Sequence, residues 1–163
     1  MPILQRNSLE FISRSTEQTR RVGMRLGAMV EMGDVICLAG DLGSGKTTFA
    51  QGFAAGWGSL DPVTSPTFVL VNLYRRPDGA RLYHLDAYRL SGPEEVVDLE
   101  PMISSGPLII EWAERIKEAL PREHLWISLR LVNPQQRDLV FVARGARYES
   151  LLAKLRQRLY GGL

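Results

Sequence analysis

The sequence of 163 residues has one cysteine, no long apolar run and almost no net charge. A single cysteine, Cys37, excludes an internal disulfide framework and a metal site built from several cysteines. A formal net charge of +2 is too small to indicate a surface that coats nucleic acid. No stretch resembles a secretory signal or a membrane span, so we expect a soluble protein of the cytoplasm with no membrane partner.

Internal repeats, low-complexity tracts and linkers are also lacking. Hydrophobic residues make up 45% and charged residues 23% of the chain, which is typical of a globular protein with one core. We therefore expect a single domain over residues 1–163.

Apolar residues follow strand and helix periods in turn along the chain. Strands are expected at residues 9–13, 34–40, 68–74, 81–88, 106–112, 124–131 and 137–144. A helix capped by Ser15 or Thr16 should follow the first strand, with an apolar face that extends to Met29 and Val30. Further helices are expected after the second and fifth strands and at the C-terminal end. This order predicts an α/β fold with mixed strand directions.

The most informative stretch is AGDLGSGKTTFA, residues 39–50, which follows an apolar strand. Gly40, Gly45, Lys46 and Thr47 fit the pattern G-x-x-x-x-G-K-[ST] of phosphate-binding loops. Glycines let backbone N–H groups approach phosphate oxygens, and the following helix adds the positive end of its dipole. Lys46 is a suitable cation for the β- and γ-phosphates, and the Thr47 hydroxyl is a suitable Mg²⁺ ligand. The stretch predicts that the protein binds a nucleoside triphosphate.

Two carboxylates end apolar strands, where an α/β sheet presents groups to its ligand. Asp86 ends RLYHLD and Glu111 ends PLIIE, and either side chain could hold a metal ion directly or through water. His84 shares a strand face with Asp86. It either has a structural role or orients a partner, which would be the Asp86 carboxylate or a water molecule. Trp112 directly follows Glu111 and is either a core residue or a ring beside the site.

The connection VTSPTF, residues 63–68, offers the hydroxyls of Ser65 and Thr67. In P-loop proteins this connection often senses the γ-phosphate, but the same residues would also suit a turn or a helix cap.

Basic residues gather near the C-terminus, where Glu149 is the sole acid beside Arg144, Arg147, Lys154, Arg156 and Arg158. This end either meets RNA or an acidic partner, or forms a solvated helix face; the composition favours the solvated face.

Together these motifs resemble the bacterial TsaE (YjeE) family. The stretches GDLGSGKTT, SPTF, HLDAYR, GPEEVVDL and IIEWAERI occur in that family's order, at residues 40–48, 65–68, 84–89, 92–99 and 109–116. The resemblance covers nearly the whole chain. It implies a P-loop NTPase-type three-layer α/β domain with a mainly parallel, mixed central sheet. It also implies a MgATP-dependent ATPase that supports threonylcarbamoyladenosine modification of tRNA in a complex with TsaB and TsaD, and that meets tRNA indirectly through this complex.

The resemblance further implies roles for individual residues. Nucleotide-binding positions fall on Gly43, Ser44, Gly45, Lys46, Thr47 and Thr48, with Thr16 and Arg137 near the adenine. Catalytic positions fall on Lys46, Asp86 and Glu111, and metal-linked positions on Thr47, Asp86 and Glu111. Positions that sense the nucleotide state or a partner fall on Ser65, Thr67 and Trp112.

Other classes of P-loop protein are less consistent with the sequence. A small-molecule kinase would need a mobile lid that carries arginine, and Arg75 and Arg76 are the only short candidates. A GTPase would be expected to carry N-K-x-D, yet none of Asn7, Asn72 and Asn133 is followed by lysine. A non-catalytic role, in which bound ATP only organises a docking surface, stays open. Because no motif fixes an arginine against the γ-phosphate, we expect slow hydrolysis by the chain alone.

Overall fold

The computed structural model describes residues 6–63, 71–90 and 98–161. The elements in chain order are β1 (Ser8–Ser13), α1 (Thr16–Gly27), β2 (Val35–Ala39), α2 (Lys46–Trp57), β3 (Val71–Arg75), β4 (Arg81–Asp86), α3 (Glu100–Ile103), β5 (Leu108–Glu111), the 3-10 helix η2 (Ala113–Ala119), β6 (His124–Asn133), β7 (Gln136–Arg144) and α4 (Ala146–Tyr160). Every expected strand and helix has a counterpart, and α3 is an element that the sequence analysis missed.

All seven strands form one sheet in the order β1-β7-β6-β2-β5-β4-β3. Strands β6, β2, β5 and β4 pair in parallel, whereas β1 with β7, β7 with β6, and β3 with β4 pair antiparallel. These pairings make β7 and β3 run against the other five strands. The expected α/β class with a mainly parallel, mixed sheet is confirmed.

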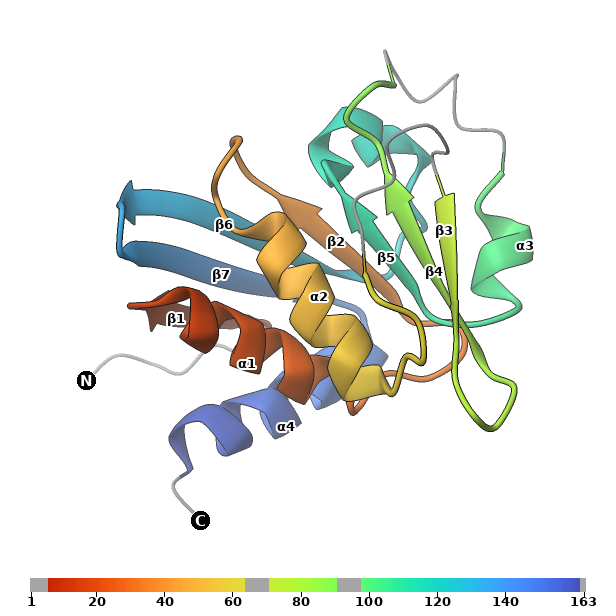
Figure 1. Cartoon of the computed structure of the whole chain (residues 1–163), viewed down its shortest axis with the longest axis horizontal. Helices are drawn as coiled ribbons and strands as arrows, with labels where there is room; N and C mark the ends of the chain where they lie inside the picture. The colour runs from red at the N-terminus through yellow and green to blue at the C-terminus, as the bar shows by residue number, and fades with distance from the viewer. Residues whose placement is uncertain (1–5, 64–70, 91–97, 162–163) are drawn as a thin grey trace.

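Helices on both faces of the sheet give the protein three layers. Figure 1 shows α1, α2 and α4 on one side of the sheet. Ile36 and Leu38 of β2 pack into the apolar cluster on that side, whereas Val35 and Cys37 pack into the cluster that includes Ala113 and other residues of the opposite side. Burial on both faces explains the uninterrupted apolar run of β2. Cys37 is a packing residue, and burial raises the pKa of its thiol.

Helix α1 begins and ends at defined residues. Ser15 is the N-cap, because its Oγ accepts a hydrogen bond from the Gln18 amide at 3.0 Å. The helix ends at Gly27, so the expectation that Met29 and Val30 lie within it is wrong. Both side chains nevertheless join the apolar cluster, which explains why their spacing fits the helical period.

Glycines bring α1 and α2 into close contact. A Cβ at Gly27 would lie 1.9 Å from the Phe53 carbonyl oxygen, and one at Gly23 would lie 2.4 Å from that of Phe49. The contact is reciprocal, since a Cβ at Gly52 on α2 would lie 2.0 Å from the Arg20 carbonyl oxygen on α1. The two backbones therefore touch without intervening side chains, and α1 fixes the helix whose first turn carries Lys46 and Thr47.

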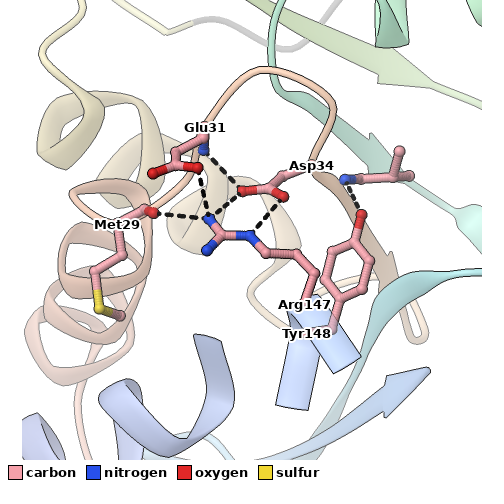
Figure 2. Close-up of polar contacts among 6 residues, drawn as sticks. Met29, Glu31, Asp34, Arg147 and Tyr148 are labelled. Carbon is pink, nitrogen blue, oxygen red and sulfur yellow. Dashed lines mark hydrogen bonds and ion pairs between the residues drawn. The ribbon is translucent and has the colours of Figure 1, made fainter. Parts of the chain in front are cut away.

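An ion pair ties α4 to the turn before β2 (Figure 2). Arg147 donates from Nε to Asp34 Oδ1 at 3.0 Å and from Nη2 to Asp34 Oδ2 at 2.7 Å. Its Nη2 also donates to the Met29 carbonyl oxygen at 3.2 Å, and Glu31 Oε2 lies 3.8 Å away. The neighbouring Tyr148 hydroxyl accepts a hydrogen bond from the Val35 amide at 2.9 Å. The start of α4 is thus fixed at the beginning of the central strand.

We expect Arg147→Ala to lower the free energy of unfolding by about 2–3 kcal/mol, because it leaves the buried Asp34 carboxylate without its bidentate partner. Urea denaturation monitored by circular dichroism measures this change. Arg158→Ala, at an exposed position in the last turn of the same helix, is the control and should change stability by less than about 0.5 kcal/mol. Equal effects of the two substitutions would show that the ion pair does not stabilise the fold.

Candidate functional site

The glycine-rich loop, residues 40–45, connects the end of β2 to the first turn of α2. Gly40, Gly43 and Gly45 have φ values of 148°, 81° and 104°, a region that side chains rarely adopt. A Cβ at Gly40 would also lie 2.2 Å from the Leu129 carbonyl oxygen on β6. Glycine is therefore required at the start of the loop both for its conformation and for close contact with the sheet.

Lys46 is the first residue of α2, is 5% exposed and extends its amine back into the loop. Its Nζ donates to the carbonyl oxygens of Gly40 at 2.5 Å and Asp41 at 2.9 Å, and to Ser44 Oγ at 3.3 Å. Burial lowers the pKa of this amine, against the opposing effect of nearby carboxylates, of which Glu114 is the strongest. The amine thus bonds to the loop's own oxygens.

Trp112 lines a cavity over the loop and contacts the Lys46 amine. Lys46 Nζ lies 3.9 Å from the centroid of the Trp112 ring, a distance suited to a cation–π contact. Trp112 has φ 59° and ψ 39°, and it is the one non-glycine residue with positive φ in the described ranges. Such a conformation costs on the order of 1–3 kcal/mol and tends to occur at functional sites. The ring also packs against the apolar cluster of η2, so both alternatives left open by the sequence describe part of its environment.

Glu111 ends β5 and receives hydrogen bonds on both oxygens. Thr47 Oγ1 donates to Glu111 Oε1 at 3.1 Å, and His84 Nε2 lies 2.6 Å from Glu111 Oε2. His84 Nδ1 lies 2.9 Å from the Tyr74 hydroxyl, so a chain of polar contacts runs from β3 through β4 and β5 to the first turn of α2. His84 is fully buried and Glu111 is 3% exposed. The chain holds the Glu111 carboxylate beside Thr47.

Asp86 ends β4 next to Glu111, because the parallel register of β4 and β5 pairs these two residues. One oxygen of Asp86 accepts a hydrogen bond from the Tyr88 amide at 2.9 Å, and burial raises the pKa of the carboxyl group. The suggestion that His84 orients Asp86 is not supported, because the ring of His84 lies between Tyr74 and Glu111.

Two cavities meet at the loop. One, of about 230 Å³, lies over the loop and is lined by Leu42, Gly43, Gly45, Lys46, Thr47, Thr48, Glu111, Trp112 and Arg137. The other, of about 270 Å³, is lined by Arg14, Ser15, Thr16, Thr19, Gly45, Thr48, Pro134, Gln135 and Arg137. The two cavities share Gly45, Thr48 and Arg137 in their linings, so Thr16 lines a cavity that is adjacent to the one over the loop.

Most of the residues singled out in the sequence line one of these two cavities. Ser44 of the loop is buried, and its hydroxyl accepts a hydrogen bond from Lys46 Nζ. Ser65 and Thr67 lie outside the described residues. In the described ranges, no group of three or more His, Cys, Asp and Glu side chains is placed to hold a metal ion. Mg²⁺ sites that use phosphate oxygens need only one or two protein carboxylates.

The sequence analysis missed three residues that contact the loop or the side chains around it. Glu114 Oε2 accepts a hydrogen bond from the Gly40 amide at 3.0 Å. The Arg115 guanidinium lies 5.2 Å from the Tyr88 ring centroid and 5.7 Å from that of Trp112. Glu114 and Arg115 belong to the stretch IIEWAERI, so their spacing after Glu111 was the available signal. For Tyr74 no signal was available, because its contact with His84 depends on the register of the hairpin.

The three-layer arrangement of helices and sheet, with a glycine-rich loop at the end of a parallel strand, defines an α/β protein of the P-loop NTPase type. A family model described as "Threonylcarbamoyl adenosine biosynthesis protein TsaE" matches residues 13–139. The chain therefore belongs to the TsaE family.

Relatives in several bacteria agree with this assignment. The chain is 39% identical to the tRNA threonylcarbamoyladenosine biosynthesis protein TsaE of Bacillus subtilis, over 90% of this chain and 93% of that protein. It is 39% identical to the protein of the same name from Treponema pallidum, over 80% of this chain and 98% of that protein. The crystal structure of YdiB from Bacillus subtilis superposes on this protein with a TM-score of 0.78 and 34% sequence identity. The match covers 97% of this chain and 99% of the YdiB chain.

No helix in the described part of the chain is both long and apolar enough to cross a membrane.

Proposed function

We propose that this protein is a MgATP-binding ATPase that supports threonylcarbamoyladenosine modification of tRNA by acting on a complex of TsaB and TsaD. The observation that carries the proposal is that Lys46, Thr47 and Glu111 converge at the glycine-rich loop that directly precedes α2. Membership of the TsaE family supports the link to this modification pathway.

The residues around the loop are suited to ATP. A Cβ at Gly43 would meet nothing within 4 Å, so the backbone there is open to a ligand. The cavity over the loop would receive the triphosphate, and the neighbouring cavity, with Thr16 and Arg137, would receive the nucleoside. Backbone N–H groups and the positive end of α2 favour an anion at this place.

The residues are equally suited to Mg²⁺. Thr47 Oγ1 and Glu111 Oε1 are 3.1 Å apart, and Asp86 lies beside Glu111 in the register of the sheet. Hydroxyl and carboxylate oxygens are the ligand types that Mg²⁺ prefers. Thr47, Glu111 and Asp86 would hold the ion, either directly or through water. When bound, Mg²⁺ supplies positive charge to phosphate oxygens.

The chain's own residues would then act on the triphosphate. Lys46 would exchange its bonds to the Gly40 and Asp41 carbonyl oxygens for bonds to phosphate oxygens. Since its amine is already buried, this exchange needs little further desolvation. Asp86, as a carboxylate, would accept a hydrogen bond from the attacking water and orient it.

Slow turnover by the chain alone follows from the arrangement of positive charge. Arg137 lines the loop cavity, but its Nη1 donates to the carbonyl oxygens of Asn133 and Pro134. Arg115 packs on the rings of Tyr88 and Trp112. We propose that a TsaB–TsaD surface completes the site, and that Ser65, Thr67 and Trp112 report the nucleotide state to it.

Phosphate release with ATP and with GTP, in the presence and absence of TsaB and TsaD, tests the proposed function. We expect slow, ATP-specific hydrolysis that the two partners accelerate. Fast hydrolysis at a rate that TsaB and TsaD do not change would refute the proposal that they complete the site. A preference for GTP would refute the ATP assignment. Tight ATP binding with no turnover under any condition would favour the docking role.

Removal of single ligand oxygens should shift the Mg²⁺ requirement. We expect Thr47→Val, Glu111→Gln and Asp86→Asn each to raise the Mg²⁺ concentration for half-maximal hydrolysis roughly 10- to 100-fold. A Mg²⁺ titration of the hydrolysis rate measures this. Glu118→Gln, at an exposed carboxylate of η2 that lines neither cavity, is the control and should behave like the wild type. Titration curves with the same half-maximal Mg²⁺ concentration for the wild type and for the variants at Thr47, Glu111 and Asp86 would remove these residues from the metal's surroundings.

A further inference from the structure

A third cavity, of about 250 Å³, lies between the end of η2 and the strands β6 and β7. In β6, Leu125 and Ile127 face the cluster under α1, α2 and α4, so the alternating residues His124 and Trp126 face the other side of the sheet. The register pairs His124 with Arg144 and Trp126 with Val142, so these side chains share that face. His124 is the first residue of β6, whereas the glycine-rich loop follows the last residue of the parallel strand β2. The cavity and the loop therefore lie at opposite edges of the sheet.

The lining of this cavity is basic. Lys117, Arg122 and Arg144 are all exposed, and none of the three forms an ion pair with a carboxylate in the described part of the chain. No carboxylate side chain lines the cavity. His124 Nδ1 donates to the Pro121 carbonyl oxygen at 2.9 Å; burial chiefly, together with Arg144 and Lys117, lowers the pKa of this imidazole. The charge available to a ligand is thus that of three cations.

This distinguishes Arg144 from other basic residues near the C-terminus. Arg147 is held by Asp34, and Arg156 donates to the Ser8 carbonyl oxygen. Those side chains serve the fold, whereas Arg144 extends into a cavity beside two further cations.

An indole ring adds a stacking surface among these cations. Trp126 Nε1 donates a hydrogen bond to Ser128 Oγ at 3.1 Å, and the ring centroids of Trp126 and His124 lie 6.2 Å apart. These two neighbours fix the orientation of the indole ring. Lys117 Nζ lies 5.1 Å from the ring centroid. An aromatic ring flanked by exposed cations on a sheet face is an arrangement by which proteins bind single-stranded nucleic acid, with bases on the ring and phosphates on the cations.

We propose that this cavity binds single-stranded RNA, with one base against Trp126 and backbone phosphates on Lys117, Arg122 and Arg144. RNA fits better than an acidic peptide, because a peptide carboxylate would use the cations but leave the indole without a planar partner. Family membership in a tRNA modification pathway supplies an RNA as the encountered molecule. The contact would be direct, in addition to any contact made through TsaB and TsaD. It is independent of ATP binding, because the two sites lie at opposite edges of the sheet.

Fluorescence anisotropy of a labelled single-stranded RNA of about ten nucleotides tests the proposal, in saturating ATP to occupy the loop. We expect Trp126→Ala to weaken binding roughly 10- to 100-fold, as for loss of a stacked base. Arg144→Glu should weaken binding and lower the slope of log affinity against log salt by at least about 0.7, as for loss of one phosphate contact. Trp126→Phe, which keeps a ring, should retain most of the affinity, and unchanged ATP hydrolysis by Trp126→Ala would show that the alanine variant is folded.

Lys154→Glu is the matched control, since it reverses an exposed charge on α4 outside the cavity, and it should leave the Trp126-dependent binding in place. Hydrolysis of ATP should be unchanged in Arg144→Glu, which separates this proposal from the proposed ATPase. Equal losses in Arg144→Glu and Lys154→Glu would overturn the site, because binding would then follow overall charge. Three other results would also overturn the site. The first is competition by polyglutamate that is as effective as competition by unlabelled RNA, and the second is no RNA binding at about 100 μM protein. The third is loss of RNA binding in Lys46→Ala but not in Arg144→Glu.

Discussion

Lys46→Ala is expected to weaken ATP binding roughly 100-fold and to lower ATP turnover on the order of 10²- to 10³-fold. The reason is that Lys46 Nζ is the side-chain cation at the centre of the loop, already desolvated and held by three loop oxygens. In the alanine variant, Arg137 is the one positive side chain among the described residues that remains in the lining of the cavity over the loop. Its guanidinium donates hydrogen bonds to the carbonyl oxygens of Asn133 and Pro134. Titration calorimetry with ATP and a phosphate-release assay measure the two effects.

The fold should survive this substitution. The side chain of Lys46 contacts loop oxygens and the Trp112 ring, so its removal should change the free energy of unfolding by less than about 1 kcal/mol. Lys154→Ala, at an exposed position of α4, is the control for loss of one positive charge and should bind ATP normally. Unchanged ATP affinity in a folded Lys46→Ala protein would remove the phosphate-binding assignment of the loop.

Gly27→Ala should destabilise the protein by about 3 kcal/mol or more, although helix propensity alone predicts the opposite sign. At an open helical position the change from glycine to alanine stabilises by about 1 kcal/mol. At Gly27 the added Cβ would lie 1.9 Å from the Phe53 carbonyl oxygen, and a backbone atom cannot move aside as the end of a flexible side chain can. Separation of α1 from α2 would also displace Phe49 and Phe53, which are fully buried.

The sign of the change decides between the two effects, and thermal or urea denaturation measures it. Ala55→Gly provides the control on the exposed side of α2, where only propensity acts, and it should cost about 1 kcal/mol. If Gly27→Ala is as stable as the wild type or more so, the helices are not held at backbone contact, and the fixed position of the loop needs another explanation.

The sequence predicted those features that depend on neighbours along the chain. The apolar run of β2, the glycine positions of the loop and the four-residue repeat of Phe49, Phe53 and Trp57 each follow from local period and backbone freedom. Asp86 and Glu111 were found in the same way, because carboxylates at strand ends point to the edge of a sheet where ligands bind. Their pairing across β4 and β5 could only be seen once the strands were in order.

Contacts between residues distant in sequence were not predicted. The alternation of β4 placed His84 with Asp86, but the hydrogen bond of His84 runs to Glu111 on the neighbouring strand. The positive φ of Trp112 could not be anticipated, since large side chains avoid it and only the surrounding structure can hold it there.

By itself, then, the sequence determined the elements, the phosphate-binding pattern and the resemblance to the TsaE family, because these depend on residue types at fixed spacings. The tertiary structure alone decided the order of the strands, the backbone contact at Gly27, the hydrogen bonds that converge on Glu111 and the basic cavity around Trp126. The physical reason is that these arrangements are set by the register of paired strands and by close packing of backbones. Register and packing join residues tens of positions apart, and no local period encodes them.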